Sequence, residues 1–569
     1  MKFIILLISI LVFINNSFTF SQNLCLNIPD TVCVNTPVTL GTHCIYNTQY
    51  WNFCDGLIDE QPLIFDRGTL PFMNSSVRIA VAEDNGIYYA FWTNFFNGNL
   101  TKCVFGNSLR NVPVTYDLGN IDSLFTSLNE GIQIIKENGN WYAFIVGSGD
   151  KFVRIDFGTS LDNPAPTANL LATIGNMGLP HGLYLFKENG IWMGLVANAN
   201  NNSFTRIVFP DSLTGNCTYS NSGTVPGVSY PTSIYPVKEN DSCYAIVTSK
   251  SSNEIYTFNF GDSYMNNQMN IINHGNVGSV LNEPFDVVVI RDCDKSFGVV
   301  SCKYHMTKIT MPQGVGGTYS GTTLFNGYVN RAEGISNAIR QGDSLYFLVA
   351  SAGNRLTVLS FGSCTGLVPS YNETGPSEIS FPDVATYQVS LFLNEGQYDQ
   401  ISECSTVTAI PEVNTPFLTI QNDSIIADPA DNISWYFNGQ IIPFYHESYM
   451  FPVNTGQYFA INSNTFCESD TSNMIDIVGI NENTLNENNK WHCSISDEII
   501  NVCICKDIKM PFQVDLYDLS GRLLQKQTLN SCSKNEVISF SINNYCKSIY
   551  IIKLSETNAI SVKKLSIIK

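Results

Sequence analysis

The sequence predicts an all-β protein built around a six-bladed β-propeller, in which each blade is a sheet of four short strands. Three observations predict this fold. A short motif similar to Phe-Gly-x-Ser recurs at intervals of 50 to 52 residues. A turn followed by a strand of aromatic and apolar residues recurs at about the same spacing. No segment keeps the 3.6-residue periodicity of a helix. A period of this length with four strands per unit is typical of propellers.

The first repeat marker occurs six times, which predicts six blades. Its copies begin at Phe105, Phe157, Phe209, Phe260, Met311 and Phe361. A β-sandwich array needs about 100 residues per domain, and solenoid repeats are usually shorter than this period. Both alternatives therefore suit the spacing less well than a propeller.

The second repeat marker is a turn followed directly by an aromatic-apolar strand. Its copies begin at Asn85, Asn138, Asn189, Asn240, Asp294 and Gly342. Asn-Gly and related pairs accept the positive φ angles of a tight hairpin. Within one period we expect strands at 131–136, 141–146, 152–157 and 168–174. Each unit then supplies one complete blade.

The N-terminus has the features of a cleavable secretory signal. Lys2 is followed by an apolar stretch from Phe3 to Ile14, and small residues near Ser21 suit a signal peptidase. We therefore assign residues 1–21 as a signal peptide. The alternative is an N-terminal membrane anchor, but the apolar stretch is short for a bilayer. No later segment reaches 18 apolar residues, so no transmembrane segment is expected.

Composition excludes some partners. The chain of 569 residues has a net charge of −19 with only 14% charged residues, and it lacks the basic footprint that nucleic acid requires. An odd number of cysteines, 17, leaves at least one unpaired, and their connectivity stays open. Cys503 and Cys505, with His492 upstream, are better explained as two buried strand cysteines than as a metal site. We expect no metal and no cofactor.

Two segments that flank the propeller resemble the halves of one PKD-type sandwich. The run from Tyr50 to Gly56, Tyr-Trp-Asn-Phe-Cys-Asp-Gly, is similar to the Trp-Asp-Phe-Gly-Asp-Gly hallmark of that family. The complementary strand, Phe381 to Leu391, follows only after the propeller. The resemblance implies halves at 22–57 and 365–411 with the propeller, 58–364, inserted between them. We expect a strand near Leu63-Ile64-Phe65 to close the last blade. The alternative is a tandem order of two degenerate modules.

The C-terminal third predicts two further β-sandwiches. Residues 412–478 carry Trp435 and a Gly-x-Tyr strand, which suit an Ig-like domain. Residues 479–569 contain Tyr-Asp-Leu-Ser-Gly-Arg, from Tyr517 to Arg522, and a basic terminal strand. This set resembles the type A C-terminal sorting domain of the Bacteroidota type IX secretion system. The resemblance implies export to the medium or the outer cell surface by that machinery. The alternative is an ordinary terminal sandwich.

The repeat also aligns candidate binding residues at one mouth of the central channel. The equivalent positions, shortly before each aromatic strand, are Glu130, His181, Thr232, Phe285 with Asp286 beside it, and Glu333. Polar residues that differ from blade to blade at an aligned position of the repeat suit a ligand site. We single out Glu130, His181, Asp286 and Glu333 as candidates. The alternative is that these are solvated rim residues facing a water-filled channel.

Sequence motifs favour binding over catalysis. The hydrolase elbow, the zinc-protease motif and the phosphate-binding loop are all missing. Our first hypothesis is a secreted or surface-attached adhesion-type binding protein, whose propeller recognises a glycan or a protein. The alternative is a secreted carbohydrate-active enzyme with its site at the channel mouth, because carboxylate pairs for glycoside hydrolysis have no fixed spacing.

Overall fold

The computed structural model describes residues 25–53 (without 43 and 45), 61–362 (without 126, 294 and 343) and 378–477 (without 422, 423, 453 and 455). In the C-terminal segment it describes 491–566, with gaps at 497–498, 506, 510, 519–521, 544–548 and 557–558. The signal peptide predicted at residues 1–21 lies outside the described residues. The described chain divides into two compact units, Met1–Glu412 with Thr465–Cys467, and Val413–Asn464 with Glu468–Lys569.

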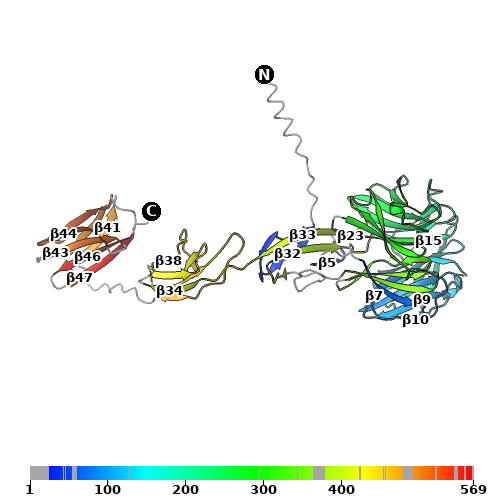
Figure 1. Ribbon diagram of the computed structural model, residues 1–569, viewed down its shortest axis with the longest axis horizontal. Coiled ribbons are helices and arrows are strands. Elements are labelled where there is room, and N and C mark those ends of the chain that lie inside the picture. Colours follow the sequence, from blue (N-terminus) through cyan, green and yellow to red (C-terminus); the bar gives the residue numbers. More distant parts are fainter. Residues whose placement is uncertain are drawn as a thin grey trace, which may run out of the picture. The chain divides into compact units, whose positions relative to one another are not determined.

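The first unit contains a β-propeller of six blades, as the repeat predicts (Figure 1). From the innermost strand outward, blade 1 consists of β7 (Ser76–Asp84), β8 (Ile87–Asn94), β9 (Leu100–Gly106) and β10 (Val114–Asp117). Blade 2 consists of β11 (Asn129–Glu137), β12 (Asn140–Gly147), β13 (Lys151–Gly158) and β14 (Thr167–Thr173). Blade 3 consists of β15 (Pro180–Glu188), β16 (Ile191–Asn198), β17 (Ser203–Phe209) and β18 (Thr218–Asn221). Blades 4 and 5 are β19 (Pro231–Glu239), β20 (Ser242–Ser249), β21 (Glu254–Asn259) and β22 (Asn270–Gly275); and β23 (Asp286–Asp292), β24 (Lys295–Ser301), β25 (His305–Met311) and β26 (Ser320–Asn326).

Blade 6 is closed by a strand from the other end of the propeller. Its inner strand is split into β27 (Ala332–Ile335) and β28 (Ile339–Gln341), both paired with β29 (Ser344–Ser351). Next comes β30 (Arg355–Phe361), and β6 (Leu63–Gly68) is the outermost strand. The closure expected near Leu63-Ile64-Phe65 is confirmed. Two short 3-10 turns, η1 (Ile121–Ser123) and η2 (Val277–Ser279), lie in loops between blades.

A sandwich module in the same unit takes strands from both sides of the propeller in the sequence. Its main sheet runs β2 (Thr31–Cys33), β33 (Ile401–Ile410), β32 (Ala385–Leu393) and β5 (Gln49–Asn52). Small pairs are formed by β1 (Leu26–Asn27) with β4 (Gly41–Thr42) and by β3 (Val38–Thr39) with β31 (Glu378–Ile379). Trp51, Phe381 and Tyr387, each at most 1% exposed, pack in its core. The polypeptide therefore leaves the main sheet of the sandwich module after β5 to form the propeller, and it returns to the same sheet at β32.

The sandwich module covers one end of the propeller channel. We call the end where the innermost strands begin the entry end, and the end where they finish the exit end. The loop after β32 reaches the exit end, where the Tyr398 hydroxyl donates to the Lys187 carbonyl at 2.9 Å and the Gln400 amide donates to the Arg291 carbonyl at 2.9 Å. Tyr398 is 7% exposed and packs on Phe186.

Gly396 of that loop has φ +74°, and a Cβ there would lie 3.0 Å from the Ala338 carbonyl oxygen. Only glycine combines this backbone conformation with so close an approach. The Tyr184 hydroxyl, on an innermost strand, donates to the Gly396 carbonyl at 3.2 Å. Among the described residues, the hydrogen bonds between the sandwich module and the propeller lie at the exit end.

Three disulfides join described cysteines of the first unit: Cys25–Cys44, Cys33–Cys467 and Cys293–Cys404. The last of these fastens the exit end of blade 5 to β33 of the sandwich module. Such bonds agree with an oxidising, extracytoplasmic location. Cys503 lies on β42 and Cys505 directly follows that strand, and both are half-buried, so they are less buried than the sequence suggested.

The second unit is also built of paired sheets. Its first segment forms β34 (Phe417–Gln421), β35 (Ser424–Asp428) and β38 (Tyr449–Met450), and a second sheet of β37 (Gln440–Ile441), β36 (Ser434–Phe437), β39 (Gly456–Ile461) and β40 (Ile475–Ile477). Trp435 and Tyr458, both at most 1% exposed, fill the core between them. The C-terminal segment forms β41 (Trp491–Ser496), β42 (Ile499–Ile504) and β45 (Val537–Ser541), and a second sheet of β44 (Leu523–Leu529), β43 (Phe512–Asp518), β46 (Ile549–Glu556) and β47 (Ala559–Ser566).

Candidate functional site

The entry end of the channel is surrounded by one residue from each blade. These six ring positions are Val77, Glu130, His181, Thr232, Phe285 and Glu333; five are the second residue of an innermost strand, and Phe285 directly precedes the first residue of β23. All are at most 4% exposed. The expectation of solvated rim residues is therefore wrong: these side chains are enclosed by the loops that precede the strands.

A left-handed residue precedes every ring position by two residues. Ser75, Leu128, Leu179, Tyr230, Glu283 and Arg331 have φ values between 45° and 58°. None is glycine, and this conformation is unfavourable for L-residues with a side chain. Six such residues in equivalent places mean that the repeat bends the chain sharply toward the channel in every blade. In blades 4 to 6 this position carries the larger polar side chains of Tyr230, Glu283 and Arg331.

Glu130 and His181 lie next to each other on blades 2 and 3. The distance between His181 Nδ1 and Glu130 Oε2 is 3.2 Å, and the side chains are 5% and 0% exposed. Neither carboxylate oxygen and neither ring nitrogen makes a well-directed hydrogen bond to a described residue. Buried polar atoms in this state are rare, and each one is a place where water or a ligand can bind.

Glu333 is the second buried carboxylate at the entry end. The Arg331 guanidinium donates to Glu333 Oε1, and the Arg331 side chain is 51% exposed. Burial raises the pKa of Glu333, and the negative charge of Glu130 raises that pKa further, against the opposing charge of Arg331. Two carboxylates therefore share one buried environment, which opposes the charged form of Glu333.

Tyr230 lies over His181, with 5.6 Å between the ring centroids. Burial raises the pKa of the Tyr230 phenol, and the charges of Glu130 and then Glu333 add to this effect. Its ring is half-buried, so Tyr230 and the 51%-exposed Arg331 are the accessible parts of this group. We call Glu130, His181, Tyr230, Arg331 and Glu333 the mouth cluster.

A second charged group borders the mouth cluster on blades 4 and 5. Lys250 Nζ lies 5.1 Å from the Tyr230 ring centroid and 4.5 Å from that of Phe285. Glu283 accepts from Lys303, and its Oε2 lies 3.8 Å from Lys250 Nζ. The hydrogen bond from Lys303 is the main cause of the lowered pKa of Glu283. Blade 5 thus presents mixed charge at the entry end.

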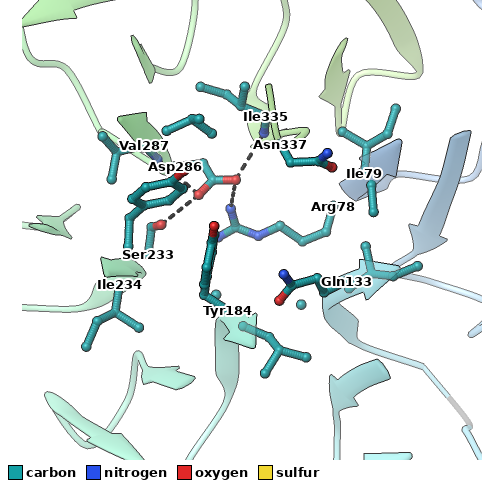
Figure 2. A pocket seen from close by; sticks show the side chains of 17 residues that line it. Arg78, Ile79, Gln133, Tyr184, Ser233, Ile234, Asp286, Val287, Ile335 and Asn337 are labelled. Carbon is teal, nitrogen blue, oxygen red and sulfur yellow. Dashed lines mark hydrogen bonds and ion pairs between the residues drawn. The ribbon is translucent and has the colours of Figure 1, made fainter. Parts of the chain in front are cut away.

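The channel is blocked directly beneath the ring positions. Arg78, one residue past Val77, extends across the channel to Asp286, with Nη1 2.6 Å from Oδ2 (Figure 2). The Arg78 guanidinium also donates to the Thr232 carbonyl at 2.5 Å, and Ser233 donates to Asp286 at 2.7 Å. The cavity lined by these residues measures about 60 Å³, enough for only a few water molecules.

Asp286 therefore differs from the other predicted site residues. The structure brings Glu130, His181 and Glu333 together at the entry end, whereas Asp286 is the partner of Arg78 inside the channel. Arg78 shares its repeat position with Gly131, Gly182 and Gly334. A Cβ at these glycines would lie 2.5 to 2.9 Å from atoms of the neighbouring blade, which excludes any side chain there.

Sequence reasoning missed Arg78, Tyr230 and Arg331. A signal for Arg78 was present, because an arginine stands at a position that is otherwise mainly glycine in the repeat. Tyr230 and Arg331 carry no such signal, since their importance comes from the left-handed turn that directs them toward the mouth. The side-chain ligand atoms of Asp292, Cys293 and Cys404 lie close enough together to hold a metal ion. The two sulfurs are, however, joined in a disulfide.

The comparisons with known proteins identify the C-terminal segment. Residues 496–569 match the family model of the secretion system C-terminal sorting domain. Within the part of the chain that the structure describes, no helix is long and apolar enough to cross a bilayer. The chain is therefore a β-propeller protein that carries a type IX sorting domain. It is a secreted or cell-surface protein.

No curated protein matches this chain. AofleA from Arthrobotrys oligospora is 9% identical, with 66% of this chain and 95% of that chain covered and a TM-score of 0.37. The GH43 endo-arabinanase from Bacillus licheniformis is 14% identical, with 41% and 93% covered and a TM-score of 0.29. The Bacteroides ovatus xyloglucan PUL GH43B is 11% identical, with 89% and 92% covered and a TM-score of 0.28. Values this low carry no information about the ligand or activity of this chain.

Proposed function

We propose that this secreted protein is an adhesion-type binding protein and that the entry end of its propeller is the recognition site for a glycan or protein ligand. The observation that carries the proposal is the contact between Glu130 and His181, whose buried polar atoms lack well-directed hydrogen bonds. Native proteins rarely leave such groups unsatisfied without a functional reason.

The two ends of the channel support this assignment. The exit end is covered by the loop that contains Tyr398, and the channel between the ends is blocked by Arg78 and Asp286. A ligand that approaches the propeller axis therefore meets the mouth cluster. Several aromatic side chains on loops at this end are exposed, as on many recognition surfaces: Phe72, Phe96, Tyr304 and Tyr328 are 50%, 65%, 54% and 47% exposed.

The test is binding of the full secreted chain to a glycan array and to immobilised extracellular proteins. We expect Tyr230→Ala and Arg331→Ala to weaken any ligand found by about tenfold or more, as for interface hot spots. Val384→Ala, at an exposed position of the sandwich module, is the matched control and should bind normally. Ligands whose binding is unaffected by both entry-end variants would place the recognition site elsewhere.

A second candidate function is carbohydrate hydrolysis at the same site. The observation in its favour is the carboxylate pair, because the raised pKa of Glu333 beside Glu130 is the arrangement that separates a general acid from a base. A hydrolysis screen of polysaccharides with the full chain separates the two functions. Turnover that disappears in both Glu130→Gln and Glu333→Gln would establish the enzyme and reject a purely binding role.

We further propose the domain boundaries that the sequence suggests. Residues 1–21 are a signal peptide, 22–57 and 365–411 form one PKD-type sandwich, and 58–364 are the propeller inserted in it. Residues 412–478 are an Ig-like domain, and 479–569 are the sorting domain of a Bacteroidota protein. The sheet that joins β2 and β5 to β32 and β33 supports the insertion. Proteolysis of the full chain should cut first near residues 412 and 479.

A further inference from the structure

The mouth cluster buries more negative charge than positive charge. The Glu130 and Glu333 side chains are 0% and 3% exposed, whereas Arg331, the partner of Glu333, is 51% exposed. Among the described residues, the ion-pair partner of Glu130 is the imidazole of His181. A buried carboxylate without a cationic partner is unfavourable until a proton or another cation compensates it.

We propose that the mouth cluster binds the protonated amine of an amino sugar, with the ammonium group against Glu130 and Glu333 and the sugar ring against Tyr230. This inference rests on the proposed function, because it names the ligand class of the same recognition site. It explains why two carboxylates and an aromatic ring converge at the entry end, where the Tyr230 ring is half-buried and Arg331 is 51% exposed.

The donors of an ammonium group match the acceptors that the mouth cluster leaves free. An ammonium group has three N–H donors. Both oxygens of Glu130 lack a well-directed hydrogen bond, and Glu333 uses its Oε1 for Arg331. The half-buried Tyr230 ring adds a surface for the sugar ring, and Lys250 Nζ already lies 5.1 Å from its centroid. The neighbouring Thr232 hydroxyl donates to the Pro284 carbonyl at 3.0 Å and lies 3.0 Å from the Thr248 hydroxyl, so it is already engaged within the propeller.

A metal ion fits the mouth cluster less well than an ammonium group. Calcium takes six to eight oxygen ligands. Among the described residues, the group of three metal-type side chains within coordinating distance is Asp292, Cys293 and Cys404, which lies at the exit end. The cation at the entry end must therefore be one that needs few ligands and brings its own donors.

The shallow depth of the mouth favours a sugar amine over a lysine side chain. The Arg78 guanidinium lies directly beneath the ring positions, where it donates to the Thr232 and Phe285 carbonyls. The cavity beyond it measures only about 60 Å³. A lysine needs depth for its four-methylene stem, whereas the amine of a hexosamine is attached directly to the ring. The sugar ring then remains level with Tyr230.

The experiment is isothermal titration of the full secreted chain with a glucosamine tetrasaccharide and with its N-acetylated counterpart, at mildly acidic pH. We expect the free amine to bind about tenfold more tightly or better, as a charge-assisted hydrogen bond provides. Glu130→Gln should remove this preference, and Glu378→Gln, an exposed glutamate of the sandwich module, should keep it.

Three results would overturn the proposal: equal or tighter binding of the N-acetylated sugar, a preference that survives in Glu130→Gln, or no binding of either sugar. A lysine peptide that binds as tightly as the tetrasaccharide would reject the sugar assignment. If both sugars bind equally and Tyr230→Ala abolishes both, the amine assignment fails while the recognition site stands. If Tyr230→Ala and Arg331→Ala leave sugar binding unchanged, the recognition site fails as well.

Discussion

Arg78 of blade 1 and Asp286 of blade 5 form an ion pair across the propeller channel, with 2.6 Å between Nη1 and Oδ2. Both side chains are largely buried, at 4% and 13% exposure. The pair joins two blades that are not neighbours in the ring and separates the mouth cluster from the rest of the channel. It also limits how deep a ligand at the entry end can reach.

Loss of this ion pair should destabilise the propeller strongly. We expect Arg78→Met to lower the free energy of unfolding by about 3–5 kcal/mol, because Asp286 is left buried without its partner. Arg355→Met is the matched control, since the side chains of Arg355 and Asp66 are 34% and 31% exposed. It should lose no more than about 1 kcal/mol. Calorimetry of the first unit's transition measures both, and equal losses would contradict a special role of the channel pair.

Glu333→Gln should raise stability at neutral pH. Because the pKa of folded Glu333 lies above its ordinary value of 4.5, the unfolded chain releases the proton first as pH rises. The carboxylate therefore opposes folding above that range, and the amide removes this penalty. The gain in Tm should be on the order of 1 °C and vanish well below pH 4.5. A lower Tm for the variant at neutral pH would show that the pairing with Arg331 outweighs burial.

His274 should make stability fall in acid. Its ring stacks on Tyr319 with 3.7 Å between centroids, and Thr257 Oγ1 lies 2.9 Å from Nε2. Burial lowers the pKa of folded His274 from 6.5 to about 4. Between these values the unfolded chain binds the extra proton, so stability decreases as pH falls.

We expect this loss to be about 1–2 kcal/mol, after allowing for the part of the ring that solvent reaches. His274→Phe keeps the stacking but cannot titrate. A plot of Tm against pH should therefore be flatter for this variant between pH 6.5 and 4. Parallel curves for the two proteins would assign the acid sensitivity to other groups.

Removal of the Cys293–Cys404 disulfide should loosen the sandwich module from the propeller. The bond closes a sequence separation of 111 residues, against 19 for Cys25–Cys44. Replacement of both cysteines of one bond by serine should cost about 2–4 kcal/mol. The loss should be about 1.5 kcal/mol larger for the longer loop. Calorimetry of the two double variants compares them directly. A larger loss for the Cys25 and Cys44 variant would argue against this account.

The C-terminal match predicts the route of export. A chain that lacks residues 479–569 should accumulate in the periplasm, because residues 496–569 are the matched sorting domain. Fractionation with immunodetection measures this. As a control, the same residues fused to an exported reporter should carry it to the medium or the cell surface. Normal release of the shortened chain would reject the sorting role.

The sequence alone determined the parts of this protein that depend on local periodicity. Six copies of the Phe-Gly-x-Ser-like motif, the first beginning at Phe105, predict the number of blades, because each copy belongs to one supersecondary unit. The strand at Leu63–Gly68 was found by the need to close the ring. The string from Tyr517 to Arg522 pointed to the sorting domain. These features are local in the chain, so they can be recognised without knowing what packs against them.

Only the tertiary structure decided what the candidate residues do. The repeat aligned Glu130, His181 and Glu333, but their burial and the direct contact between Glu130 and His181 follow from the loops packed over them. Asp286 stands one position beyond the aligned Phe285 and proved to be the partner of Arg78, a residue more than 200 positions away in the chain. Charge, burial and pairing arise from neighbours that are distant in the sequence, and a period cannot specify those neighbours.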